Sequence, residues 1–115
     1  MTGAAVHVHV HHENPHAGQG PVVLDVGADV GALVVVMPET MADVEIEIRS
    51  VGASHRAHLS HVGVVGRPVR GRTIWSAVFP VLHAGRYELY ERVAGRPQLI
   101  VDISGGAVTQ VSWPR

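Results

Sequence analysis

The stretch Asp43-Val44-Glu45-Ile46-Glu47-Ile48-Arg49 decides the fold class, because apolar and charged residues alternate through it without interruption. In an extended chain successive side chains point to opposite faces, so Val44, Ile46 and Ile48 would face a core and the charged residues the solvent. On a helix the same apolar residues would be scattered around the axis. The stretch therefore predicts a strand in a sheet with one exposed face.

Short runs rich in β-branched residues recur on both sides of this strand, separated by turns that contain Gly or Pro. We expect further strands at residues 22–26, 32–37, 56–62, 72–79, 86–93, 98–103 and 108–113. The expected turns contain Gly66-Arg67-Pro68, Ala84-Gly85, Ala94-Gly95-Arg96-Pro97 and Gly105-Gly106. We also expect Pro80 to end a strand and residues 40–42 to form at most one helical turn. Seven or eight short strands predict an all-β fold, an antiparallel sandwich or a small barrel.

Composition narrows the function classes. The chain has 115 residues, no Cys and no Lys, so disulfides, thiolate zinc sites, thiol catalysis and Schiff-base chemistry are excluded. Its formal charge of −1 argues against a nucleic-acid or acidic-membrane partner, either of which would require a basic patch. No apolar stretch reaches the roughly 18 residues of a membrane span, and the first residues do not resemble a secretory signal. We therefore expect a cytoplasmic protein.

The head of the chain, Val6-His7-Val8-His9-Val10-His11-His12, alternates Val and His. On a strand its alternate histidines would share one face, about 6–7 Å apart, which is a spacing that can chelate a divalent transition metal. His-rich short tracts often bind metals. The sequence therefore predicts a site for Ni²⁺, Cu²⁺ or Zn²⁺, with imidazole ligands assisted by a carboxylate. The candidate ligands are His7, His9, His11, His12, Glu13 and His16.

The same head has a second interpretation that needs no metal. Val6, Val8 and Val10 would form the other face of the strand, so the head could be an added edge strand that pairs with the body or with another subunit. A Gly-, Pro- and Asn-containing linker follows it. We therefore divide the chain into an N-terminal strand or tail with its linker, residues 1–21, and a β-sandwich domain, residues 22–115.

Other candidate sites are weaker. His7-x-His9-x₃-Glu13-x₆-Gly20 matches the first cupin metal motif, but the second motif does not follow. On a strand, His58 would face away from His55 and His61, so these three alone do not predict a tridentate site. A serine triad could be assembled from Ser60 or Ser104, a histidine and Asp102, but no G-x-S-x-G elbow exists. We expect His83 to be a solvated loop residue, and Trp75 and Trp113 to be core residues or a binding platform. The remaining candidate is a local basic spot at Arg67, Arg70 and Arg72.

The run Phe79-Pro80-Val81-Leu82-His83-Ala84-Gly85-Arg86-Tyr87-Glu88-Leu89 resembles a corner found in prealbumin-like sandwiches, among them carboxypeptidase regulatory-like and collagen-adhesin B-type domains. The resemblance covers residues 31–113 and implies that fold. The whole chain is also similar to a group of small uncharacterised actinobacterial proteins. A buried Tyr87 needs a partner for its hydroxyl, commonly a loop carbonyl, so we expect a structural role for this side chain.

We expect a non-enzymatic accessory or binding module that captures a divalent metal through its N-terminal histidines. The alternative is a structural or protein-interaction domain that uses the head as an added edge strand, with a protein partner or a second copy of the chain. An esterase-type hydrolase is a third possibility without a recognisable motif.

Overall fold

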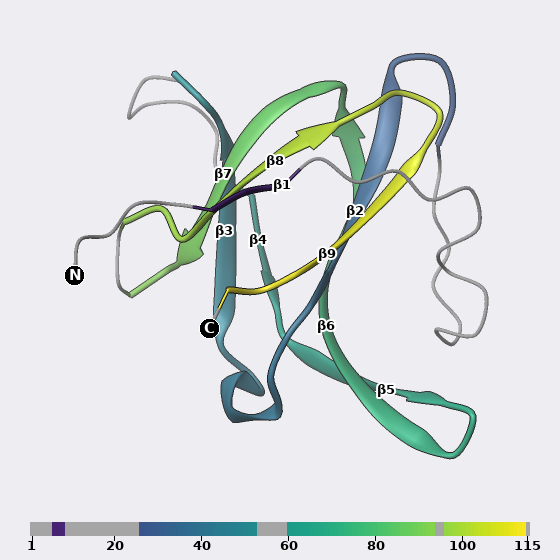
Figure 1. Ribbon diagram of the computed structural model, residues 1–115, viewed down its shortest axis with the longest axis vertical. Helices are drawn as coiled ribbons and strands as arrows, with labels where there is room; N and C mark the ends of the chain where they lie inside the picture. Colours follow the sequence, from purple (N-terminus) through teal and green to yellow (C-terminus); the bar gives the residue numbers. More distant parts are fainter. Residues whose placement is uncertain (1–5, 9–25, 53–59, 94–95, 115) are drawn as a thin grey trace.

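The computed structural model describes residues 6–8, 26–52, 60–93 and 96–114, which form an all-β fold (Figure 1). One short 3₁₀ helix, Glu39–Met41, lies where one helical turn was expected. None of the described helical segments is long and apolar enough to cross a membrane. The strands are β1 (Val6–Val8), β2 (Val30–Val36), β3 (Glu45–Ser50), β4 (Ser60–Gly63), β5 (Val65–Val69), β6 (Arg72–His83), β7 (Gly85–Glu91), β8 (Leu99–Ile103) and β9 (Val108–Ser112).

The strands form two sheets. Sheet A has the order β1-β8-β7-β3-β4, and sheet B has the order β5-β6-β2-β9. All neighbours are antiparallel except the pairs β1/β8 and β2/β9, which are parallel. The long strand β6 belongs to sheet B, and the chain then passes through Ala84 into β7 of sheet A. The eight strands β2–β9 agree with the seven or eight expected for the body of the protein.

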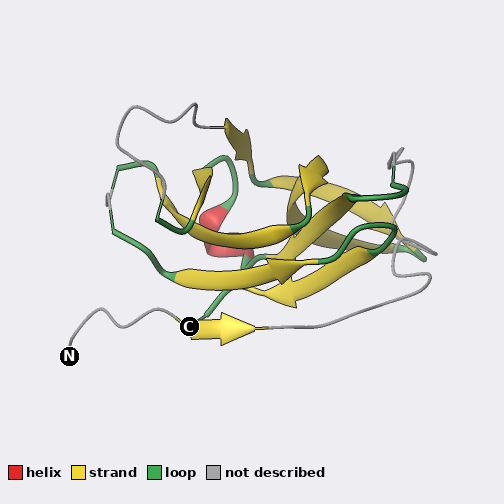
Figure 2. Ribbon diagram, turned by 90° about the horizontal axis from the view of Figure 1, so that it is seen from above, coloured by secondary structure: helices red, strands yellow, loops and turns green. Residues whose placement is uncertain are grey.

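The two sheets bury a common core between them, and Figure 2 shows the layers from the side. Alternation assigns the residues, because every second side chain of a strand points inward. Ile46 and Ile48 of β3 are buried, as the opening stretch predicted. The other core residues are Leu33, Val35, Met37, Val64, Ala77, Phe79, Leu82, Leu89, Leu99, Val101, Ile103, Val111 and Trp113.

Two expectations about proline are wrong. Gly66-Arg67-Pro68 is not a turn but part of β5, and the turn lies at Arg70-Gly71, where both residues have positive φ angles of 50° and 80°. Pro80 does not stop β6, which continues to His83. The register between β2 and β6 shifts at this point, and a bulge tolerates a residue that has no N–H to donate.

The remaining differences concern strand ends and coverage. The predicted strand at residues 22–26 lies outside the described residues except for Val26, which is not in a strand. The predicted strand at 56–62 is described only from Ser60 onward, where β4 begins. Trp113 is buried in the core, and Trp75 is partly buried against it, so both tryptophans pack with the core rather than forming a platform.

Candidate functional site

His7 is the one proposed metal ligand that the structure describes. It lies in the middle of β1, in register with Ile100 of β8. The other proposed ligands, His9, His11, His12, Glu13 and His16, lie outside the described residues. Within the described ranges, no group of three or more His, Asp or Glu side chains is placed to hold a metal ion.

The pairing of β1 with β8 forms one edge of sheet A. The register joins Val6 to Leu99 and Val8 to Val101. The side chains of Leu99 and Val101 are fully buried, so β8 is firmly anchored in the core. β1 pairs with β8 alone, and residues 9–25 separate it from the body in sequence. The N-terminal segment thus contributes an edge strand of three residues.

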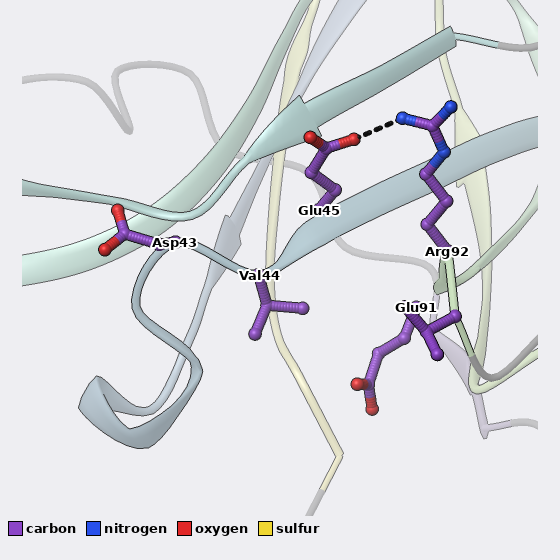
Figure 3. Close-up of a pocket in the computed structure, with 6 residues that line it drawn as sticks. Asp43, Val44, Glu45, Glu91 and Arg92 are labelled. Carbon is purple, nitrogen blue, oxygen red and sulfur yellow. Dashed lines mark hydrogen bonds and ion pairs between the residues drawn. The ribbon is translucent and has the colours of Figure 1, made fainter.

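One hollow on the described surface lies at two neighbouring strands of sheet A (Figure 3). It has a volume of about 400 Å³ and lies between the start of β3 and the end of β7. Val93, which is 98% exposed, contributes to its apolar surface. The lining residues are Asp43, Val44, Glu45, Glu91, Arg92 and Val93. The lining therefore lacks a hydroxyl nucleophile and a histidine base, and its one cation, Arg92, already has partners.

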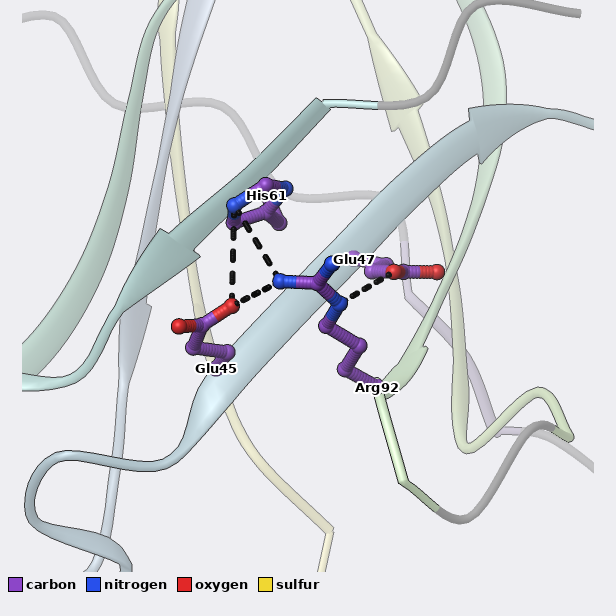
Figure 4. A network of polar contacts seen from close by, with 4 residues as sticks. All are labelled: Glu45, Glu47, His61 and Arg92. Carbon is purple, nitrogen blue, oxygen red and sulfur yellow. Dashed lines mark hydrogen bonds and ion pairs between the residues drawn. The ribbon is translucent and has the colours of Figure 1, made fainter.

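Those partners form a polar cluster beside the hollow (Figure 4). Arg92 donates a hydrogen bond from Nη1 to Glu45 Oε1 at 2.6 Å, and its Nε lies 3.3 Å from Glu47 Oε2. His61 Nε2 lies 3.5 Å from the same oxygen of Glu45 and 3.4 Å from Arg92 Nη1. Two of the four residues lie in β3, His61 lies in β4, and Arg92 directly follows β7, so the cluster joins three neighbouring strands on the outer face of sheet A.

In this cluster one guanidinium, that of Arg92, pairs with two carboxylates. The hydrogen bond from Arg92 lowers the pKa of Glu45 below its ordinary value, and the same bond raises the pKa of Arg92. Both groups are solvent-exposed, so water screens the interaction and its net effect on stability is small. The cluster is therefore a surface ion-pair network in which Arg92 engages both carboxylates.

The aspartate proposed for a serine triad, Asp102, is engaged elsewhere. Asp102 Oδ1 accepts a hydrogen bond from Arg86 Nε at 2.8 Å, so a guanidinium occupies the carboxylate that would have to orient a histidine. His83 is exposed and lies 3.6 Å from Asp29 Oδ2. Tyr87 donates its hydroxyl hydrogen bond to the carbonyl of His83 at 2.7 Å, as expected for a structural tyrosine, and burial raises its pKa.

Arg92 and its contacts could not be found from the sequence pattern. Alternation places Glu45 and Glu47 on the outer face of a strand, but Arg92 is 45 and more residues away along the chain. Only the register between β3 and β7, which pairs Glu47 with Tyr90, brings the guanidinium to the two carboxylates. A single sequence contains no signal for that register.

The described part of the chain therefore offers a strand edge at β1/β8, an open hollow and an ion-paired polar cluster. None of these by itself identifies a reaction. Compared with protein-family models, with curated proteins and with solved structures, the chain matches none of them.

Proposed function

We propose that this protein is a non-enzymatic interaction module whose N-terminal segment is an added edge strand that can pair with β8 of a second copy. The pairing of β1 with β8 is the observation that carries this proposal. β1 is short, lies at the end of sheet A and makes no other strand pair among the described residues. Its docking site is thus a single exposed strand edge, which is the kind of surface that strand addition uses.

The edge of β8 needs a partner strand. β8 pairs with β7 on one side, and without β1 the backbone groups on its other side would face solvent as an unprotected edge. A strand supplied by the same chain and one supplied by a second copy make the same contacts with Leu99, Ile100 and Val101. Exchange of β1 therefore costs little once the connecting segment can reach the partner.

The sequence of the connecting segment suits such an exchange. Residues 9–25 contain Asn14-Pro15 and Gly18-Gln19-Gly20-Pro21, which are typical of linkers. This segment joins β1 to the body of the protein ahead of β2, and its length would let β1 pair with β8 of its own domain or with β8 of a neighbouring copy. Self-association through β1 is consequently the function that the geometry supports best.

We also infer that the sandwich is prealbumin-like. The corner that carries the resemblance, Phe79 to Leu89, spans the passage from β6 to β7, and Tyr87 ties that corner to the carbonyl of His83. Phe79 and Leu89 are both buried in the core. On this interpretation the sandwich is the scaffold, and the N-terminal segment makes the contact with the second copy.

The first prediction concerns oligomeric mass. The full chain should be dimeric in light scattering at micromolar to millimolar concentration, and a shortened chain that begins at Gly20 should be monomeric. A proline in β1 should act like the deletion, because proline removes a backbone N–H and fixes φ. Adjacent residues of a parallel strand turn their N–H groups to opposite sides, so His7→Pro and Val8→Pro are tested separately and at least one must dissociate the dimer.

His7→Ala is the matched control, since it removes the imidazole and keeps the backbone hydrogen-bonding groups. It should leave the mass unchanged. A monomeric full chain, or a dimer that survives both proline variants and the deletion, would contradict strand exchange.

A second candidate function is metal capture by the head. It is favoured by the position of His7 on a strand, because strand geometry is what the Val/His alternation requires for a row of imidazoles on one face. The proposed ligands are His7, His9 and His11, with His12, Glu13 and His16 as further donors. Imidazole ligands suit Zn²⁺, Cu²⁺ and Ni²⁺.

This proposal has its own measurement. Titration calorimetry with Zn²⁺, Ni²⁺ or Cu²⁺ on the untagged full chain should give near-stoichiometric, tight binding. Replacing His7, His9 and His11 together by alanine should weaken it by more than about tenfold. The control, His61→Ala with His83→Ala, removes two exposed histidines of the body and should change little. Binding that survives truncation to Gly20 would refute a site in the head.

A further inference from the structure

The hairpin formed by β5 and the first half of β6 extends away from the rest of the fold, at the lower right of Figure 1. β5 pairs with β6 alone. The turn Arg70-Gly71 joins Val69 to Arg72, and its two positive φ angles are those of a tight two-residue type I′ connection. The hairpin is therefore a narrow ribbon whose tip is exposed.

Positive charge collects on this ribbon, and no acidic residue among those the structure describes neutralises it. The chain contains no Asp or Glu between Glu47 and Glu88, a span with six arginines. Of the arginines on sheet A, Arg49 pairs with Glu88, Arg86 with Asp102, and Arg92 with Glu45 and Glu47. In contrast, no described carboxylate pairs with Arg67, Arg70 or Arg72 of the hairpin. Arg67 is bound to Ser76 Oγ at 2.7 Å, whereas Arg70 and Arg72 are exposed.

The same face of the ribbon carries apolar side chains. Cross-strand partners share a face, so the pairs Val65/Ser76, Arg67/Ile74 and Val69/Arg72 lie on the face turned away from the core side chain Trp75. Val65 is 48% exposed, and Val69 and Ile74 are half-buried. Basic and apolar groups are thus mixed on one projecting surface.

The free edge of β5 does not suit strand addition. In a hairpin with a two-residue turn, the residue pair next to the turn exchanges backbone hydrogen bonds, and here this pair is Val69/Arg72. The next pair, Pro68/Thr73, is therefore a pair without backbone hydrogen bonds between its two residues. The backbone of Pro68 therefore turns outward, where it has no N–H to offer. A partner must engage the side chains of this hairpin rather than its edge.

We propose that the β5–β6 hairpin docks on an anionic phospholipid surface, with Arg67, Arg70 and Arg72 at the headgroups and Val65, Val69 and Ile74 against the acyl boundary. Guanidinium groups bind phosphate in a bidentate manner. A bilayer surface offers phosphate groups to the basic side chains and acyl chains to the apolar ones. A nucleic acid would bind the basic side chains but offer no apolar surface to the others. The proposal does not depend on β1.

The total charge of the chain does not oppose this proposal. The value of −1 includes ten acidic residues, none of which lies on the hairpin. Electrostatic attraction to a charged surface decays within about 10 Å at 0.1 M salt, so the local charge of a projecting ribbon decides the contact. The absence of a basic excess over the whole chain therefore says little about this one surface.

The test is flotation of the full chain with vesicles of 70% phosphatidylcholine and 30% phosphatidylserine, compared with vesicles of phosphatidylcholine alone. The full chain should partition at least tenfold more strongly onto the anionic vesicles at 0.1 M salt. Each basic residue near such a surface contributes roughly a factor of five, so Arg70→Asn with Arg72→Gln should lower partitioning by about twenty-five-fold. Arg70→Asn creates an Asn-Gly pair, which type I′ turns favour, so the hairpin is retained.

The matched control is Arg96→Gln, which removes an exposed arginine outside the hairpin and should change partitioning by less than about twofold. Equal binding to both vesicle types, no binding, or equal losses in the hairpin and control variants would overturn the proposal. So would tighter binding to a 30-base-pair DNA duplex that depends on Arg70 and Arg72, because it would assign the hairpin to a nucleic acid. Unchanged circular dichroism of each variant ensures that the comparison concerns the surface.

Discussion

Gly31→Ala is expected to lower the free energy of unfolding by about 3 kcal/mol, the upper end of the usual cost of overpacking. Gly31 lies in β2, which has a neighbour on each side in sheet B. A Cβ atom there would collide with the carbonyl oxygen of Ser104 and would lie 2.9 Å from that of Ala107. Both oxygens belong to the backbone of the turn between β8 and β9, so no side chain can rotate away to make room.

The matched control for this prediction is Gly63→Ala. Gly63 also lies in a strand, β4, but a Cβ atom there would meet nothing within 4 Å. This variant should change stability by less than about 0.5 kcal/mol. Urea unfolding followed by circular dichroism measures both. Equal stability of the two variants would mean that the turn at 104–107 does not pack against β2 as described.

The strands that could be predicted from the sequence are those whose pattern is local. Residues 43–49 alternate strictly, and β3 follows with Ile46 and Ile48 in the core. The Gly105-Gly106 turn and the strand after it were equally clear, because glycine marks a turn and Val108 and Val111 are apolar. In each case the information lies within a few neighbouring residues.

β5 was missed because its composition reflects contacts that are distant in sequence. A glycine occurs inside this strand because Trp75, the partner of Gly66 on β6, fills the space that a side chain would need. A Cβ atom on Gly66 would lie 3.0 Å from the Trp75 ring. Pro68 is tolerated because β5 is an edge strand. Both residues are typical of turns, and only the sheet order shows why they occur here.

The candidate sites divide in the same way. The Val/His alternation is a local signal of period two, and His7 lies in the three-residue strand β1. The hollow beside Glu45 and the contacts of Arg92 depend on how β3, β4 and β7 are aligned. The positive charge of the β5–β6 hairpin likewise depends on the sheet arrangement, because the acidic partners of the other arginines lie on sheet A. Such arrangements are properties of the assembled sheets.

The second large effect is expected for Leu89→Ala, which should cost about 3–4 kcal/mol, within the range found for buried leucines. Leu89 lies in β7 near the centre of sheet A, in register with Ile48 on one side and Leu99 on the other, and it is fully buried. Alanine would leave a cavity between three strands that are held by backbone hydrogen bonds and cannot close around it. Thermal unfolding by calorimetry should show a correspondingly lower melting temperature.

Val93→Ala is the control, because Val93 is 98% exposed and its truncation should change the free energy of unfolding by less than about 0.5 kcal/mol. Equal costs for the two variants would contradict a core between the sheets. The comparison also separates fold from function. Leu89→Ala weakens the strand beside β8 and should reduce both stability and dimerisation, whereas a proline in β1 acts at the edge of sheet A. Loss of the dimer with a nearly unchanged melting temperature is therefore specific to strand exchange.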